Sequence, residues 1–163
     1  EGRINSDLAN DLGNLCQRSL SMANKHLGNK IKCVSLDKEE LEILNSAIKL
    51  NKNLSDMVMK QNISDYIKSV WDLINNSNKY FNENEPWKKV KVDLDEFNKI
   101  LFTTAELIKI IAIYIFPIMP STSKKIFNYL NLETSNINSE YLKIEEFNDY
   151  KINSIEALFP RIT

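Results

Sequence analysis

The sequence contains little glycine or proline, with three glycines and four prolines among its 163 residues. β-Sandwiches and β-barrels need many tight turns, which these two residue types commonly supply. Long segments with apolar residues at steps of three and four run between the few that are present. We therefore expect an all-α protein, a bundle of about five main helices that forms a single domain over residues 1–163.

Cysteine and histidine are also sparse, since Cys16, Cys33 and His26 are the only residues of these two types. A structural zinc site needs four ligands at close spacing, and three scattered residues do not supply them. We expect no metal site in this chain. Cys16 falls on a helical apolar stripe, which favours a packing role in the core.

An excess of charge of one sign and a long hydrophobic run are both missing. The formal net charge is −1, whereas a domain that coats a phosphate backbone usually has a clear basic excess. Any nucleic-acid site must therefore be local and selective. No signal-peptide pattern is present, and the most apolar segment, Leu107 to Met119, is short and interrupted by Lys109 and Pro117. It is typical of a buried core helix, and we expect a cytoplasmic protein without a membrane segment.

The first predicted helix runs from Asn5 to Leu27. Asn5 or Ser6 is a suitable N-cap, and Gly28 is expected to end the helix. Its apolar residues recur three or four positions apart, which indicates one buried stripe. The members of this stripe are Leu8, Leu12, Leu15, Cys16, Leu20, Ala23 and Leu27.

The opposite side of this helix is polar and contains Asn14 and Arg18. These residues are four positions apart, so their side chains project together from neighbouring turns. Asparagine offers a donor and an acceptor, and the guanidinium group offers a flat fork of donors. The pair can read the edge of a base while the guanidinium holds a phosphate or stacks on a ring. The alternative interpretation is an ordinary solvated helix face.

The same periodicity predicts four further helices, each bounded by capping or breaking residues. They run from Ser35, with a spacing like that of a capping box, to Met59; from residues 62–64 to residues 83–85; from Asp93 to Phe116; and from Thr122, capped by the run at 121–123, to Leu130. The predicted core includes Leu12, Leu15, Leu20, Ile67, Trp71, Ile74, Ile108, Ile111 and Ile115.

The two tryptophans lead to different predictions. Trp71 is in register with apolar residues of the third helix, and we expect it in the core. Trp87 is outside this pattern, and we expect Pro86 to fix it in an extended geometry. Three lysines, Lys88, Lys89 and Lys91, follow. An indole held rigidly beside cations is a suitable platform for an unpaired base, and a plug over the end of the bundle is the alternative.

At this point the chain resembles a known family. The run NSDLANDLGNLCQR, from Asn5 to Arg18, is similar to the first anticodon-domain helix of bacterial and organellar methionyl-tRNA synthetases. The segments NKY at 78–80 and PW at 86–87 resemble the end of the third helix of that domain. IMPSTS at 118–123 resembles its turn between the fourth and fifth helices, and LFPR at 158–161 also matches. The resemblance covers essentially the whole chain.

The resemblance implies an α-helical domain that binds the CAU anticodon loop of methionine and initiator tRNAs. By position, Asn14, Arg18 and Trp87, with Pro86 before it, would contact the first anticodon base. The full-length protein would be an ATP-dependent methionine–tRNA ligase, in which this domain adjoins an N-terminal catalytic domain.

The ATP-binding signatures of such enzymes are absent from this sequence, so we expect a fragment without a catalytic site and without a cofactor. ATP, with Mg²⁺ or Zn²⁺, would belong to the catalytic domain. Two alternatives stay open: the same domain of a cysteine- or leucine-type synthetase, and a helical interaction module that does not bind RNA.

Overall fold

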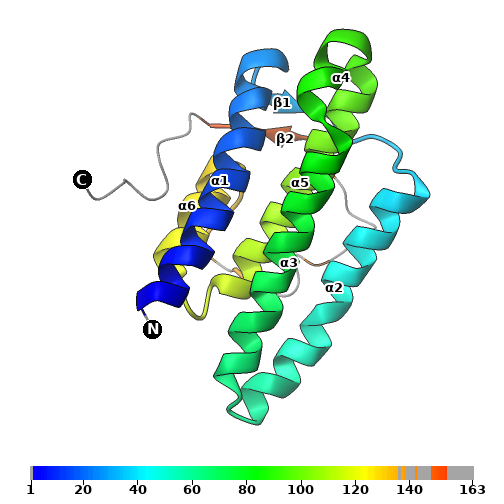
Figure 1. Ribbon diagram of the computed structural model, residues 1–163. Coiled ribbons are helices and arrows are strands. Elements are labelled where there is room, and N and C mark those ends of the chain that lie inside the picture. Colours follow the sequence, from blue (N-terminus) through cyan, green and yellow to red (C-terminus); the bar gives the residue numbers. More distant parts are fainter. Residues whose placement is uncertain (1, 136, 139–141, 143–147, 154–163) are drawn as a thin grey trace.

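The computed structural model describes residues 2–135, 137–138, 142 and 148–153. Within these residues the protein is a bundle of four long helices and two shorter ones, with a minimal two-stranded sheet (Figure 1). The elements are α1 (Gly2–His26), β1 (Lys30–Ile31), α2 (Lys38–Met59), α3 (Ile63–Asn84), α4 (Pro86–Val92), α5 (Leu94–Ile115), α6 (Pro120–Tyr129) and β2 (Tyr150–Lys151). The all-α prediction of about five main helices is confirmed. The predicted motif at 158–161 lies outside the described residues.

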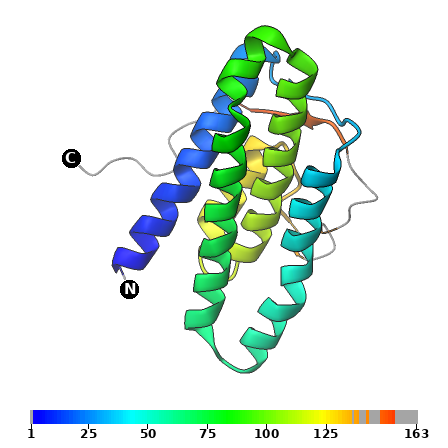
Figure 2. The ribbon, with the colours of Figure 1, turned by 45° about the vertical axis from the view of Figure 1, so that its right-hand side comes forward.

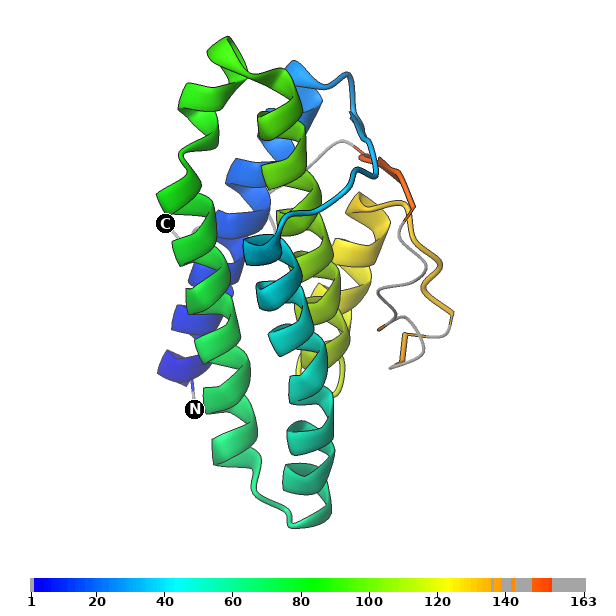
Figure 3. The ribbon, with the colours of Figure 1, turned by 90° about the vertical axis from the view of Figure 1, so that its right-hand side faces the viewer.

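Helix α5 is the centre of the bundle. Every residue from Leu101 to Ile115 is buried, and α1, α2, α3, α4 and α6 all pack against it. Figures 2 and 3 show α2 and α3 as an antiparallel hairpin alongside α5, with α1 on one flank and α6 on another. A helix that is apolar on all sides is expected in such a central position. No described helix has the length and apolar character needed to cross a membrane.

Helix α1 buries the stripe that its spacing predicts, except for Leu27, which follows the last residue of the helix and is partly buried. Leu12, Leu15 and Cys16 are fully buried, and burial raises the pKa of the Cys16 thiol to about 12. The core role of Cys16 is thus confirmed. The helix ends at His26, followed by Gly28 at φ +60, where the absence of a side chain permits a left-handed turn.

The predicted start of α1 is wrong, because the helix already begins at Gly2. Asn and Ser favour a cap only where the chain before them leaves the helical path, and both are tolerated inside a helix.

The second helix begins inside the predicted starting segment, residues 35–39, but Ser35 is not its cap. Helix α2 begins at Lys38, and Asp37 is its N-cap residue. No capping hydrogen bond from the Asp37 side chain forms, because its Oδ2 accepts from Lys99 Nζ of α5 at 2.6 Å instead. A tertiary contact has replaced the local one. From there the helix is continuous to Met59.

The fifth predicted helix also differs at its start, because α6 begins at Pro120 with Met119 as the N-cap residue. The cap predicted at 121–123 does not form. Ser123 instead donates from Oγ to the carbonyl of Ala112 on α5 at 2.6 Å.

The junction of α3 and α4 differs from the predicted extended segment around Trp87. Helix α3 ends at Asn84, as predicted, and Glu85 adopts the left-handed conformation with φ 46 and ψ 59. Pro86 then begins α4, so Trp87 is helical. Proline is favoured at this position because its ring fixes a helical φ and no hydrogen bond is lost there. Glu85, rather than Pro86, is the residue whose backbone leaves the helical path between α3 and α4.

Most of the predicted core is confirmed. Seven of the nine residues listed above are fully buried: Leu12, Leu15, Leu20, Ile74, Ile108, Ile111 and Ile115. The prediction is wrong for Ile67 and Trp71, which are only partly buried at the margin of the core. Trp71 Nε1 donates a hydrogen bond to Asp11 Oδ2 of α1 at 2.9 Å, and an indole N–H with a polar partner is typical of a ring at the edge of a core.

The small sheet was not predicted. Lys30 pairs with Lys151 and Ile31 with Tyr150 in antiparallel register, which fixes the segment around residue 150 beside the loop after α1. Tyr150 is buried, and its hydroxyl donates to Glu106 Oε1 of α5. Lys109 Nζ lies 3.0 Å from the other oxygen of Glu106. The buried carboxylate therefore has a partner on each oxygen.

Candidate nucleic-acid interface

Arg18 and Trp87, two of the predicted site residues, lie together in the structure. The guanidinium carbon of Arg18 is 5.5 Å from the centroid of the Trp87 ring and 5.0 Å from that of Phe81. Both distances are within the range of a cation–π contact. Three separate elements contribute to this cluster: α1 supplies Arg18, the last turn of α3 supplies Phe81, and the first turn of α4 supplies Trp87.

The sequence places each of these side chains by a local rule. Arg18 lies away from the buried stripe of α1 and is exposed. Phe81 continues the buried stripe of α3 and is fully buried, so it forms the floor of the cluster. Pro86 is buried, and it fixes the start of α4 next to that floor. Trp87 therefore packs at 6.3 Å and a 60° tilt against Phe81 while 37% of its own surface stays exposed.

A fourth residue completes the cluster. Arg18 Nη1 donates a hydrogen bond of 2.9 Å to Oδ1 of Asn82 on α3. We define the aromatic–arginine cluster as Arg18, Phe81, Asn82 and Trp87. Sequence reasoning did not identify Phe81 or Asn82 as site residues. Phe81 follows the core periodicity of α3, and Asn82 occurs in a polar run with no distinguishing motif.

Asn14 lies beside the cluster rather than inside it. Its exposed side chain is on α1, one turn before Arg18. Among the described residues it makes no hydrogen bond with a member of the aromatic–arginine cluster. The structure thus brings together Arg18, Trp87 and Pro86 from the predicted site, and it leaves the polar group of Asn14 open to solvent.

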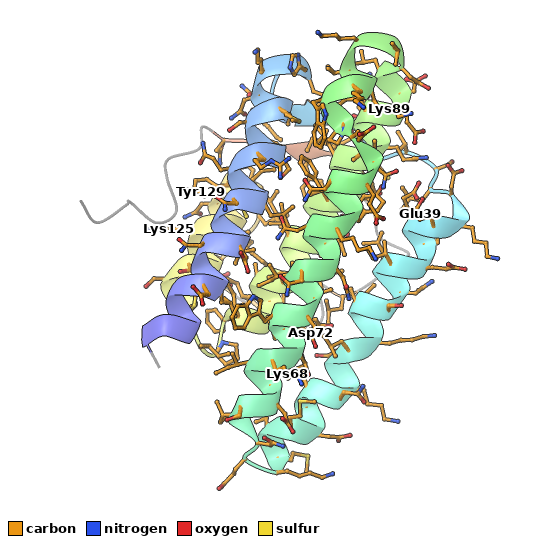
Figure 4. All side chains as sticks on the ribbon, in the orientation of Figure 1. Glu39, Lys68, Asp72, Lys89, Lys125 and Tyr129 are labelled. Atoms are coloured by element: carbon orange, nitrogen blue, oxygen red, sulfur yellow. The ribbon has the colours of Figure 1, made fainter. Side chains whose placement is uncertain are left out.

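Lysines of α4 lie near the cluster although the whole chain is nearly neutral. Helix α4 contains three lysines, of which Lys88 pairs with Glu85 at 3.1 Å. Figure 4 shows Lys89 on α4, at the same end of the bundle as the C-terminal end of α1. Cations beside an exposed indole suit a ligand that combines a flat ring with a negative charge, as a nucleotide does.

Solved structures with the same fold define the class of this domain. It superimposes on the apo form of Mycobacterium tuberculosis methionyl-tRNA synthetase with a TM-score of 0.90 and 28% identity, over 99% of this chain and 34% of that chain. The same enzyme in complex with methionyl-adenylate gives a TM-score of 0.89 over 98% of this chain and 32% of that one. The fold is thus that of a helical domain within an aminoacyl-tRNA synthetase.

The sequence comparisons are more specific. Residues 33–163 match the family described as the anticodon binding domain of methionyl tRNA ligase, and the chain belongs to this family. The methionine–tRNA ligase of Clostridium acetobutylicum is 35% identical over 98% of this chain and 25% of that protein. That of Caldanaerobacter subterraneus is 34% identical over 98% of this chain and 26% of that protein. The chain thus spans about a quarter of the length of these relatives, and the methionine family is favoured over the cysteine and leucine types.

Proposed function

We propose that this chain binds the anticodon loop of tRNA, and that Trp87 and Arg18 contact the first base of the CAU anticodon of methionine and initiator tRNAs. The observation that carries this proposal is the aromatic–arginine cluster. It combines a partly exposed indole with a guanidinium group that has unused N–H donors. RNA recognition commonly uses this pairing, because unpaired bases stack on aromatic rings while side-chain donors read their edges.

Each residue has a separate role in this proposal. The indole of Trp87 supplies a stacking surface, which by itself accepts any base. The guanidinium of Arg18 supplies donors for the O2 and N3 acceptors of cytosine. Asn14, one turn earlier on α1, offers both a donor and an acceptor toward the same base. Pro86 makes no contact through a polar group and acts by fixing the position of Trp87.

We further propose that the whole protein joins this domain to a catalytic domain that attaches methionine to tRNA with ATP, in the cytoplasm. The similarity to much longer methionine–tRNA ligases supports this assignment. The aromatic–arginine cluster contains no group suited to acid–base or nucleophilic chemistry. We assign this cluster a role in recognition, and ATP with Mg²⁺ or Zn²⁺ would be bound by the proposed catalytic domain.

Direct binding of anticodon stem-loop RNA tests this proposal. Four stem-loops that differ only in the first anticodon base, with A and U at the next two positions, would be titrated with the chain by fluorescence anisotropy at fixed salt. We expect the loop with cytosine to bind most tightly, by about tenfold or more, as one well-placed set of base contacts provides. Equal binding of all four loops, or no binding of any, would overturn the proposal.

A further inference from the structure

We infer that Asn82 is a positioning residue for base recognition: it orients the Arg18 guanidinium so that the remaining N–H groups face the first anticodon base. This inference rests on the proposed function. The observation behind it is the 2.9 Å hydrogen bond from Arg18 Nη1 to Asn82 Oδ1. Asn82 does not need to touch the RNA in order to affect which base is preferred.

An exposed arginine on a helix has many accessible rotamers, so its donors have no fixed direction unless other groups hold them. Two kinds of contact hold Arg18. The rings of Phe81 and Trp87 lie within 5.0 and 5.5 Å of the guanidinium carbon, and they limit where the group can lie. The hydrogen bond to Asn82 limits its rotation. Only the second contact determines which N–H groups point outward.

Phe81 and Asn82 are adjacent residues on the last full turn of α3, which is anchored by the burial of Phe81. The amide of Asn82 is therefore presented from a rigid element beside the aromatic floor. Two contacts from one rigid helix turn fix a long side chain more effectively than contacts from a mobile loop would.

The chemistry of the acceptor also suits a role in RNA binding. An amide oxygen is neutral, so it orients the guanidinium without cancelling its positive charge. The hydrogen bond uses one of five guanidinium N–H groups and leaves four for a ligand. Arg18 thus keeps both its charge for the phosphate backbone and its donors for a base edge.

This arrangement predicts a specific effect of removing the amide. Asn82→Ala leaves the stacking surface of Trp87 and the charge of Arg18 in place, so binding of all four loops should persist. The preference for cytosine should decrease about three- to tenfold, since one orienting hydrogen bond is lost. The chain should stay folded, because Asn82 is exposed, alanine favours a helix, and the core and the contacts of Trp71 and Asn78 with Asp11 still hold α1 against α3.

The test is a double-mutant cycle with Arg18→Ala, using the same four stem-loops. Asn82→Ala should reduce the preference for cytosine when Arg18 is present and should have no effect in the Arg18→Ala background. The matched control is Asn76→Ala, an exposed asparagine of α3 that borders the groove between α2 and α3. It should leave the preference unchanged.

A second readout needs no RNA. The sequence contains three arginines, at positions 3, 18 and 161, so the guanidinium signals of Arg18 can be assigned by NMR from the Arg18→Ala variant. We expect slow rotation of the Arg18 Nη groups in the unsubstituted chain and faster rotation in Asn82→Ala.

The outcomes separate the two proposals. A preference for cytosine that depends on Arg18 but not on Asn82 would overturn this inference and leave the proposed function standing. If Asn82→Ala reduced the preference equally in the unsubstituted and the Arg18→Ala backgrounds, its role would be independent of Arg18. That result would also overturn this inference and leave the proposed function standing. If the unsubstituted chain showed no preference for cytosine, both proposals would be overturned.

Discussion

The indole N–H of Trp71 donates a hydrogen bond of 2.9 Å to the carboxylate of Asp11, and this bond ties the middle of α3 to α1. Asn78 Nδ2 adds a bond of 3.3 Å to the backbone carbonyl of Asp11. The bond between Arg18 and Asn82 connects the same two helices nearer the cluster. The relative position of α1 and α3, on which the candidate site depends, is therefore fixed by polar contacts as well as by the shared core.

The first prediction concerns this tie. Trp71→Phe keeps an aromatic ring but removes the N–H donor, and we expect it to lower the free energy of unfolding by about 1–2 kcal/mol, as a lost hydrogen bond to a charged group does. Trp71→Ala should lower it further, by about 3 kcal/mol, because ring packing is lost as well. Urea unfolding followed by circular dichroism measures both. Equal stability of Trp71→Phe and the unsubstituted chain would show that the bond to Asp11 contributes nothing.

The second prediction concerns Trp87, for which we expect the opposite balance of effects from Trp71. The free energy of unfolding of Trp87→Ala should be within about 1 kcal/mol of that of the unsubstituted chain, because the side chain is partly exposed at the end of the bundle. It should nevertheless weaken binding of the cytosine stem-loop about 5- to 150-fold, which corresponds to the 1–3 kcal/mol typical of base stacking on an aromatic ring. Stability and RNA affinity must be measured on the same variant. A large loss of stability would place Trp87 in the core rather than in a binding site.

The third prediction concerns the two thiols. Cys16 is fully buried with its pKa raised to about 12. Cys33 is partly exposed, although burial and the nearby carboxylates of Asp149 and Glu106 raise its pKa as well, so its contrast with Cys16 rests on access of the reagent. A thiol reagent at pH 8 should modify Cys33 in the folded chain and Cys16 only after unfolding, since the thiolate is the reactive form. The Cys33→Ser variant should show no reaction until denaturant is added. Rapid modification of that variant under native conditions would contradict the burial of Cys16.

The fourth prediction concerns alkaline pH. Burial raises the pKa of the Tyr150 hydroxyl well above its ordinary value of 10, and the nearby Glu106 carboxylate adds to the shift. In the unfolded chain the phenol ionises near pH 10, while in the folded chain it stays protonated. The stabilisation is therefore complete below pH 10 and is lost progressively as the pH rises above it.

Tyr150→Phe tests this assignment. It removes the donor to the buried Glu106 oxygen, and we expect a loss of about 1–3 kcal/mol at pH 7. Above pH 10 the free energy of unfolding should fall less steeply with pH in the variant than in the unsubstituted chain. The two slopes should differ by up to about 1.4 kcal/mol per pH unit. Parallel curves for the two proteins above pH 10 would show that folding does not raise the pKa of the Tyr150 hydroxyl, which would contradict this assignment.

Local periodicity allowed much of the fold to be predicted. The apolar stripe of α1 follows from spacing, because a helix places residues three and four apart on one side. The burial of α5 follows instead from its strongly apolar composition around the whole helix. The environment of Trp71 could not be read in the same way. Its register indicated burial, but its position next to Asp11 depends on how α1 and α3 pack. The pairing of Ile31 with Tyr150 likewise joins segments far apart in the sequence, for which no periodic signal exists.

The candidate site was predictable in part for the same reason. Arg18 and Trp87 were identified from a family resemblance and from the break at Pro86, and the structure places them in contact. Asn82 was missed because its role comes from a tertiary contact with α1. The geometry of Trp87 was also predicted incorrectly. The sequence marks the end of a helix before Pro86, but only the backbone shows that Glu85 takes the left-handed conformation and that α4 begins directly after it.

The central claim is that Trp87 and Arg18 form the surface that reads the first anticodon base. The most direct test is aminoacylation by the proposed full-length ligase that contains this domain, with tRNA bearing cytosine or another base at that position. We predict that Trp87→Ala and Arg18→Ala each lower kcat/KM for the cytosine tRNA and reduce its advantage over the other three, and that the double variant loses less than the product of the two single effects. If both single variants fold normally and keep the full preference for cytosine, the base is read elsewhere and the claim is wrong.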